Sequence, residues 1–389
     1  MLPTSADVLE ALRGVIDPEL GADIVELGMA RSAVVGDDGT VVVTVALTTA
    51  GCPLRAQLMR EIVSRVEGLP GVSKVKLDWT EMDDAQRSAA MDVARRAAQD
   101  SAGPNAVPSG ARVLAVASGK GGVGKSSVTA NLAAALAQRG FAVGVIDADI
   151  WGFSIPRMLG LDGRLTAEAT ADGGRRIQPR SVPLGRGRLE VVSMGFLVDD
   201  ETDALMWRGL ILNRAVQHFL EDVDWSDDLD YLVIDLPPGT GDVQMGLARM
   251  LPQAEMLVVT TPAIAAQRVA SRAVTMARKS HLHVLGVIEN MSGFRCEHGT
   301  VQHVFGQGGG EALAAEAEVP LIGTIPLEAA VSAGGDAGTP VSLGSGPAAD
   351  AIRAITDRLV DDLAPPVSMA GCSARMLAAA VAALDAAGS

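Results

Sequence analysis

The sequence has few cysteines, no excess of positive charge and no long apolar run. Three cysteines in 389 residues do not provide the disulfide framework of a secreted protein, so we expect a reducing environment. The formal net charge of −15 at pH 7 argues against non-specific nucleic-acid binding, which needs basic surface to displace counterions. No stretch of about 18 uninterrupted apolar residues predicts a transmembrane helix, and no charged segment leads into an apolar signal core. We therefore expect a soluble cytoplasmic protein with neither nucleic-acid nor membrane partners.

The residues that are present predict more than one domain. Hydrophobic residues make up 48% of the chain, and its length favours two or three domains. Residues 1–83 contain two stretches with helical spacing, a hairpin pattern around Asp38-Gly39 and one alternating strand, which together predict a small α+β domain. Residues 84–110 are rich in Ala, Arg and Asp and end in SAGPNAVPSG, so we assign them to a linker.

Residues 111–365 predict a doubly wound α/β domain. Short apolar runs with the length of buried strands alternate with helical stretches, which is typical of a mostly parallel sheet. The predicted strands are RVLAVA, AVGVID, YLVID, EMLVVTT, VLGVIEN and PLIGTIP. The Ala-rich remainder, residues 366–389, predicts a helical tail.

A phosphate-binding loop follows the first of these strands. Gly119–Ser126 matches G-x-x-x-x-G-K-[ST] at every fixed position. Glycines let backbone N–H groups turn toward phosphate oxygens, and the N-terminus of the following helix faces the same anion. Lys125 can neutralise phosphate charge, and the Ser126 hydroxyl suits Mg²⁺. The residues expected around ATP are Gly119, Lys120, Gly121, Gly122, Val123, Gly124, Lys125, Ser126 and Ser127.

Three carboxylates end strands that adjoin this loop. Asp147 and Asp149 close the run VIDAD, and Asp235 closes YLVID. A carboxylate at this end of a parallel strand can belong to the magnesium shell or orient the attacking water. Each of the three could instead cap the segment that follows it.

The sequence around these motifs resembles a known family. The form KGGVGKS is similar to the deviant P-loop ATPases that include MinD, ParA and nitrogenase iron-protein relatives. Across residues 112–358, the stretches DADIWGFSIPRMLG, MWRGLILNRAVQHF and LPPGTGD resemble the Mrp (ApbC-type) iron–sulphur cluster carrier ATPases. The N-terminal stretches IDPEL and LTTAGCPLRAQL resemble the MIP18-type domain of iron–sulphur assembly proteins.

The resemblance implies roles for the residues of the nucleotide site. Lys120 would reach across a homodimer to the nucleotide of the partner, so that Lys120, Lys125 and Asp149 form the catalytic set. Asp149 would position water, whereas Asp235, with Asp147 and Ser126, would contribute to the magnesium shell.

The resemblance also implies roles outside the phosphate loop. Asn290, Pro326 and Leu327 would lie against the adenine ring. Arg208 is similar to a residue near the dimer interface, with a structural salt bridge as the alternative. Cys52 sits at the start of a predicted helix, where a thiolate is favoured; it is either a transient cluster contact or a half-buried cysteine.

The family pattern is incomplete at the expected cluster site. Mrp-type carriers place Cys-x-x-Cys after the NMS segment, whereas this chain has Cys296 followed three residues later by Gly299. His298 or His303 could supply nitrogen ligands, Cys372 could fold back as the missing ligand, or Cys296 is a plain thiol on a loop.

The sequence therefore predicts a slow, Mg²⁺-dependent ATPase that carries an iron–sulphur cluster. Its expected partners are a second copy of the chain, apoprotein clients and assembly factors. One alternative is a nucleotide-switched scaffold without a stable cluster. Another is a positioning ATPase like ParA or MinD, against which the tail argues because it lacks a basic amphipathic face.

Overall fold

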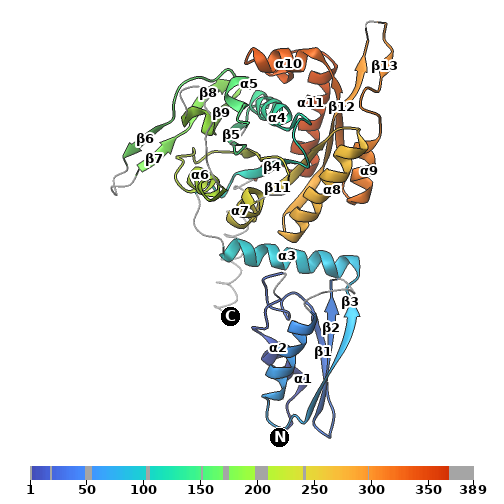
Figure 1. Cartoon of the computed structure of the whole chain (residues 1–389). Coiled ribbons are helices and arrows are strands. Elements are labelled where there is room, and N and C mark those ends of the chain that lie inside the picture. Colours follow the sequence, from blue (N-terminus) through green and yellow to red (C-terminus); the bar gives the residue numbers. More distant parts are fainter. Residues whose placement is uncertain are drawn as a thin grey trace, which may run out of the picture. The chain divides into compact units, whose positions relative to one another are not determined.

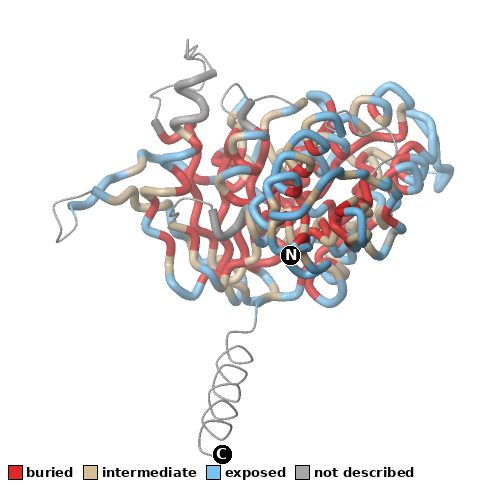
Figure 2. Tube along the Cα trace, turned by 90° about the horizontal axis from the view of Figure 1, so that it is seen from below, coloured by how far each residue is buried: buried red, intermediate tan, exposed pale blue. Residues whose placement is uncertain are grey.

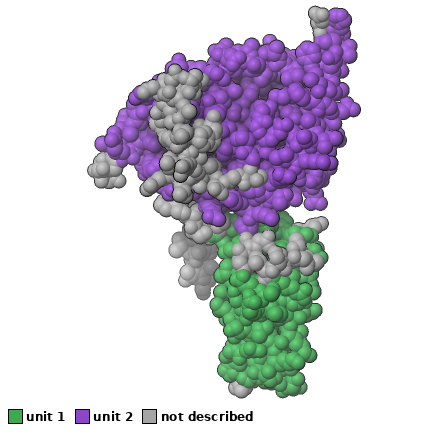
Figure 3. Space-filling model, in the orientation of Figure 1, with its two compact units in different colours: residues 1–102 green, residues 103–389 purple. Residues whose placement is uncertain are grey.

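The computed structural model describes residues 2–17, 20–48, 55–101, 106–149, 152–169, 175–197, 209–239, 242–296 and 298–367. The chain divides into two compact units, residues 1–102 and 103–389 (Figure 3). Each unit has its own hydrophobic core. Among the described residues, no helix is both long enough and apolar enough to cross a membrane.

The first unit is a three-stranded sheet packed against helices. Strands β1 (Ala30–Val35) and β2 (Thr40–Leu47) form the predicted antiparallel hairpin, and β3 (Lys74–Glu81) pairs parallel with β2. Helix α1 (Ser5–Leu12) starts at a capping box, in which the Thr4 side chain accepts from Asp7 N–H and the Asp7 carboxylate accepts from Thr4 N–H. Helix α2 (Arg55–Glu67) places Leu58, Ile62 and Val66 in the core.

A third helix differs from the linker expected at residues 84–110. Helix α3 (Asp84–Ser101) covers most of that stretch, and its Ala90 and Ala94 are buried in the core of the first unit. Alanines four residues apart lie on one helix face, so this composition specifies a packed helix. At the other end of the stretch, Ala106 N–H donates to Leu220 O inside the second unit.

The second unit is built on a mixed sheet of nine strands in its described part. The order is β13–β12–β11–β4–β10–β5–β9–β8, with β14 also paired to β12. All neighbouring pairs from β14 through β9 are parallel, and only the edge strands β8 and β13 pair antiparallel, which confirms the predicted mostly parallel sheet. The strands are β4 (Arg112–Ser118), β5 (Ala142–Asp147), β8 (Arg180–Leu184), β9 (Gly187–Ser193), β10 (Tyr231–Asp235), β11 (Glu255–Thr260), β12 (His283–Arg295), β13 (Val301–Gln302) and β14 (Leu321–Leu327).

Helices cover both faces of this sheet, as the doubly wound fold requires (Figure 1). One face is covered mainly by α4 (Lys125–Arg139), α5 (Ile155–Met158) and α11 (Pro347–Arg358). The other is covered by α6 (Gly209–Glu221), α7 (Asp242–Met250), α8 (Ile264–Lys279) and α9 (Gly309–Glu316). Alternate residues of β4 enter the two cores, Val113 and Ala115 on one side and Leu114 and Val116 on the other. The buried strands run between exposed helix surfaces (Figure 2).

Several elements were not predicted from the sequence. Strand β9 and its antiparallel partner β8 extend the sheet beyond β5, and β6 (Thr166–Ala169) pairs with β7 (Arg175–Gln178) in a separate hairpin. Strand β12 continues past Asn290 to Arg295, where β13 pairs back on it. A last pair of elements, α10 (Ala329–Asp336) and a π-helical turn at Leu359–Leu363, flanks α11. The predicted tail helix lies almost entirely outside the described residues.

Candidate functional site

The loop between β4 and α4 has the backbone that its glycines allow. Gly122 and Gly124 adopt φ values of +80° and +82°, in the left-handed region that favours glycine. A Cβ on Gly119 would lie 2.2 Å from Ala270 N, and one on Gly124 would lie 2.2 Å from Asn290 Nδ2. These glycines therefore permit both the turn and the close packing of the loop against α8 and β12.

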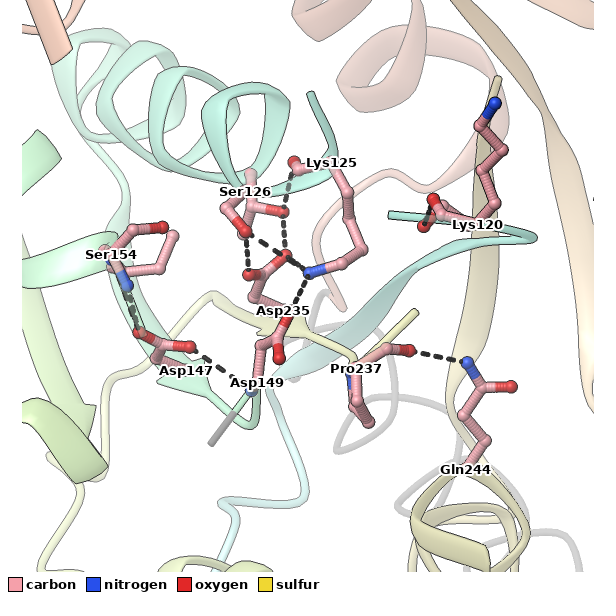
Figure 4. A network of polar contacts seen from close by, with 12 residues as sticks. Lys120, Lys125, Ser126, Asp147, Asp149, Ser154, Asp235, Pro237 and Gln244 are labelled. Carbon is pink, nitrogen blue, oxygen red and sulfur yellow. Dashed lines mark hydrogen bonds and ion pairs between the residues drawn. The ribbon is translucent and has the colours of Figure 1, made fainter. Parts of the chain in front are cut away.

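The described loop is centred on a buried lysine and carboxylate. Lys125 Nζ lies 2.7 Å from Asp235 Oδ1 and 3.6 Å from Asp149 Oδ2 (Figure 4). Asp235 is fully buried and also accepts hydrogen bonds from Ser126 Oγ at 2.5 Å and from Thr129 Oγ1 at 2.8 Å. The structure thus brings together Lys125, Ser126 and two of the three predicted carboxylates at one point.

This arrangement fits a bound Mg²⁺ and an anion. The Ser126 hydroxyl and the Asp235 carboxylate are adjacent oxygen donors, the ligand type that Mg²⁺ prefers. Lys125 is 6% exposed and is neutralised by Asp235 and Asp149. Burial raises the pKa of Asp149, while the charge of Lys125 opposes that rise. A phosphate group bound in the loop would compete with Asp235 and Asp149 for Lys125.

Asp147 has different surroundings, although it ends the adjacent strand β5. Its Oδ2 accepts from Ser193 Oγ at 3.0 Å and from the N–H groups of Ser154 and Ile155 at 3.1 and 3.3 Å. Its Oδ1 accepts from Asp149 N–H at 3.3 Å. Burial and the nearby charge of Asp235 raise the pKa of Asp147 to about 7, with Lys125 opposing them. Membership of a magnesium shell stays a prediction for Asp147, whose two oxygens here accept hydrogen bonds from protein groups.

A cavity of about 320 Å³ opens beside the N-terminus of α4. Asn290, Pro326 and Leu327, predicted to face adenine, line it together with Gly124 and Ser127 of the loop. Asn290 donates its amide Nδ2–H to Val123 O at 2.9 Å, which fixes this side chain against the loop. The volume is within the lower range of small-molecule sites.

Sequence reasoning missed the remaining walls of the cavity. They come from α5, from the start of β12's extension and from α10: Arg157, Met158, Met291, Glu328, Val331, Ser332, Gly335 and Asp336. The one local signal is in the DADIWGFSIPRM stretch, where Arg157 and Met158 follow closely after Asp147 and Asp149. Nothing in the sequence places α10 beside it.

Lys120 lies in the loop without facing its centre. The residue is exposed, and its side chain points away from Lys125 and Asp235 (Figure 4). Its carbonyl oxygen accepts from Ser118 Oγ at 3.1 Å. The backbone of Lys120 is thus fixed while its ammonium group is available to solvent.

The predicted cluster loop is the turn between β12 and β13. Cys296 N–H donates to Thr300 O at 3.0 Å and Gly299 N–H donates to Cys296 O at 2.9 Å, with Gly299 at φ +81°. Hydrogen bonds from the N–H groups of His298 and Thr300 lower the pKa of the Cys296 thiol. His303 Nδ1 lies 3.3 Å from Ser292 O on the opposite strand. Within the described ranges, no group of three or more His, Cys, Asp or Glu residues is arranged to hold a metal ion.

Three residues named from the sequence lie outside the described part of the chain. They are Cys52, Arg208 and Cys372. Of the three cysteines, Cys296 is therefore the one whose surroundings are known, and its thiol is free and partly exposed.

Comparison with known proteins gives the same picture of two units. Residues 110–360 match the ParA family described as NUBPL iron-transfer P-loop NTPase, and residues 5–77 match a family described as iron–sulfur cluster assembly protein. An iron–sulfur cluster carrier protein of Mycobacterium tuberculosis is 45% identical over 348 residues, 88% of each chain. A protein of that name from Synechocystis is 40% identical over 372 residues, 95% of this chain and 99% of its own.

A solved structure of similar fold contains a nucleotide. It is a nucleotide-binding protein from Archaeoglobus fulgidus in complex with ADP, 34% identical, with a TM-score of 0.51 over 60% of this chain and 89% of that one. These matches confirm the resemblance drawn from the sequence. The chain belongs to the family of NUBPL-type iron-transfer P-loop NTPases.

Proposed function

We propose that this protein is an ATP-dependent iron–sulphur cluster carrier, which binds a cluster and passes it to apoproteins. Relatives 40–45% identical over most of the chain carry the name iron–sulfur cluster carrier protein. The N-terminal unit matches an iron–sulfur assembly family. The buried lysine, hydroxyl and carboxylate of the phosphate loop form a suitable site for ATP.

Each residue of the nucleotide site would have its own role in ATP hydrolysis. Lys125 would exchange its contact with Asp235 for the β- and γ-phosphates, and the loop N–H groups would hold the same oxygens. Asp149, 3.6 Å from Lys125, would orient the attacking water. Ser126 and Asp235 would hold Mg²⁺ directly or through water, and the bound ion would neutralise charge developing on the phosphate oxygens.

Turnover is expected to be slow, and a second copy of the chain would complete the site. The exposed Lys120 ammonium is the group that the family resemblance assigns to the partner's nucleotide, and its side chain points away from Lys125 and Asp235. In a single copy of the chain, the loop residues position the phosphates and neutralise their charge without Lys120 of a second copy, so turnover would be slow. Such a nucleotide-bridged homodimer would act as a switch between two conformations.

One observation carries the link between nucleotide and cargo. Strand β12 runs from Asn290, which contacts the phosphate loop and lines the cavity, to Arg295, which directly precedes Cys296. Six residues connect the two sites along the backbone, with an irregularity at Met291, where φ is +59° and the pairing with β14 shifts register before Phe294. A short backbone path through β12 therefore joins Asn290 to the residue before the thiol, and a shift of Asn290 on nucleotide binding would be passed along this path.

The surface around this thiol suits contact with another protein. Large apolar side chains that are 39–58% exposed surround it, namely Phe294, Val301, Val304 and Phe305. Exposed apolar groups of this kind are favoured at interfaces that bury them. We assign this hairpin to the contact through which a cluster is held and handed to a client.

The second candidate function, a nucleotide-switched scaffold without a stable cluster, is favoured by Gly299. A two-fold dimer with one thiol per turn offers two thiolates, whereas a [4Fe–4S] cluster is usually held by four. The histidines of the same hairpin are the nearest additional donors, and both His298 and His303 are exposed.

Anaerobic reconstitution with iron and sulphide separates the two functions. We expect the full chain to take up iron with visible cluster absorption, and Cys296→Ala to lose it. Cys52→Ser is tested beside it and shows whether the thiol of the other unit contributes to the cluster. Wild-type protein without stoichiometric iron would exclude the carrier function, and ATP-dependent binding of a client without iron would establish the scaffold instead.

A further inference from the structure

We propose that Asp147 is a positioning residue that holds helix α5 in place and thereby connects the phosphate end of the nucleotide site to the wall of the base cavity. This inference rests on the proposed nucleotide site. It assigns Asp147 a role in binding the base, independent of Mg²⁺.

The first observation is how the carboxylate is shared. Both backbone donors at the start of α5, Ser154 N–H and Ile155 N–H, bind Oδ2, which also accepts from Ser193 Oγ at the end of β9. The other oxygen accepts from Asp149 N–H. One fully buried side chain therefore fixes both Asp149, which faces Lys125, and the first turn of α5 (Figure 4).

The second observation is what α5 carries. Arg157 and Met158 of this short helix line the cavity together with Pro326 and Leu327. A helix of four residues is too short to be stable by its own hydrogen bonds, so its position depends on its anchors. Ile155, fully buried in the core, and the carboxylate of Asp147 are the anchors at its N-terminal end.

The other end of α5 lies close to the turn that follows α10. A Cβ on Gly160 would lie 2.8 Å from Gly338 O, and one on Gly338 would lie 2.5 Å from Gly160 Cα. The turn after α5 therefore touches the turn after α10 backbone to backbone. With its C-terminal end in fixed contact, α5 can move mainly at its N-terminal end, which is where Asp147 binds it.

The phosphate end and the base end of the nucleotide site are therefore coupled through α5. If Asp147 releases α5, Met158 moves in the cavity and contact with the base weakens. If bound phosphate takes Lys125 away from Asp149, the shared carboxylate transmits the resulting shift of Asp149 to α5. A magnesium ligand would behave differently, because its removal would affect binding only when the metal is present.

The test compares ligands with and without a base, in the presence of EDTA. Affinities for ADP and for inorganic tripolyphosphate are measured by calorimetry for the full chain, Asp147→Asn, Met158→Ala and the double variant. Asparagine keeps the shape but replaces one acceptor oxygen by a donor. We expect Asp147→Asn to weaken ADP binding about tenfold, as loss of a charge-assisted hydrogen bond does, and to change tripolyphosphate binding less than about twofold.

The double variant shows whether the effect passes through α5. With Met158 already truncated, Asp147→Asn should weaken ADP binding by clearly less than it does alone, because the wall it positions is gone. Ser193→Ala, which removes one of the donors and none of the cavity, should have an intermediate effect on ADP.

Three results would overturn the proposal. Unchanged metal-free ADP affinity in Asp147→Asn, with Mg²⁺-dependent ATP affinity lowered, would make the residue a metal ligand. Fully additive effects of the two substitutions would rule out transmission through α5. Unchanged ADP affinity in Met158→Ala would remove α5 from the base site and refute this inference, whereas the phosphate loop itself would be refuted only if the wild-type chain bound neither ADP nor tripolyphosphate.

Discussion

Replacing Lys125 by methionine should destabilise the second unit in a pH-dependent way. Lys125 is 6% exposed and lies 2.7 Å from the fully buried Asp235. Removing one partner of a buried pair leaves an uncompensated charge, which costs about 3 kcal/mol or more. For a unit of this size, that corresponds to a fall of roughly 6 °C in the melting temperature.

The sign of the pH dependence follows from the carboxyl groups left behind. Burial and Asp235 already raise the pKa of Asp147 to about 7 although Lys125 opposes them. Without the lysine, the buried carboxyls should gain protons more readily in the native state than in the unfolded chain. Native-state protonation stabilises the variant as pH falls, so the deficit relative to wild type should be larger at pH 8 than at pH 5.

Scanning calorimetry of the full chain at both pH values measures this deficit for the second unit. Lys120→Met is the matched control, since it removes the same charge from an exposed position of the same loop and should leave the melting temperature nearly unchanged. An equal loss at pH 5 and pH 8 in Lys125→Met would refute the assignment of the deficit to unpaired carboxylates. Loss of ATP turnover should accompany the substitution at either pH.

Two further predictions concern the glycines and the thiol. Gly124→Ala should lose nucleotide affinity and about 1–2 kcal/mol of stability, because alanine at φ +82° is strained and its Cβ displaces Asn290. For stability, Gly121→Ala is the control, because nothing lies within 4 Å of the added Cβ. Nucleotide binding at wild-type strength in Gly124→Ala would contradict the observed packing. Cys296 should react with iodoacetamide at a lower pH than an ordinary cysteine, because backbone N–H groups stabilise its thiolate. Thr300→Ala, which removes a hydroxyl contact to the sulphur, should move the midpoint of that pH profile upward, measured in a chain whose other two cysteines are serine; an unchanged midpoint would contradict the hydrogen bonding described.

The parts of the structure that the sequence predicted are those encoded by local periodicity. Strands such as β4 and β10 are uninterrupted apolar runs because both faces of the sheet are covered, and they appear where those runs lie. The phosphate loop was predictable because its glycines and Lys125 are required by the backbone and the charge of the ligand, independently of the rest of the fold.

The parts that escaped prediction depend on distant segments. Met158 and Asp336 line one cavity although 178 positions separate them in the numbering, and only the sheet topology brings α5 and α10 together. The alanines and charges of residues 84–101 are also typical of a polar linker, so composition alone does not indicate helix α3. The helix is stabilised because its alanine face packs into the core of the first unit. For Asp147, the sequence showed a carboxylate at a strand end and left its role open between metal shell and cap. The positions of Ser154 and Ile155 then showed that it caps α5.

The turn at Cys296 also explains why glycine at position 299 is more than a missing ligand. Gly299 adopts φ +81°, and a Cβ placed there would meet nothing within 4 Å. A cysteine would therefore fit in space but would hold a left-handed backbone at a cost of about 1–2 kcal/mol. With glycine, the turn closes without strain and directs the N–H groups of His298 and Thr300 at the Cys296 sulphur. Two cysteines at positions 296 and 299 could bind one metal ion only if the N–H groups of His298 and Thr300 pointed away from the Cys296 sulphur, so that both sulphurs could converge on the ion. The turn of this chain is instead built to present a single stabilised thiolate, so any cluster it holds would draw its remaining ligands from the partner copy, the histidines, Cys372 or the client.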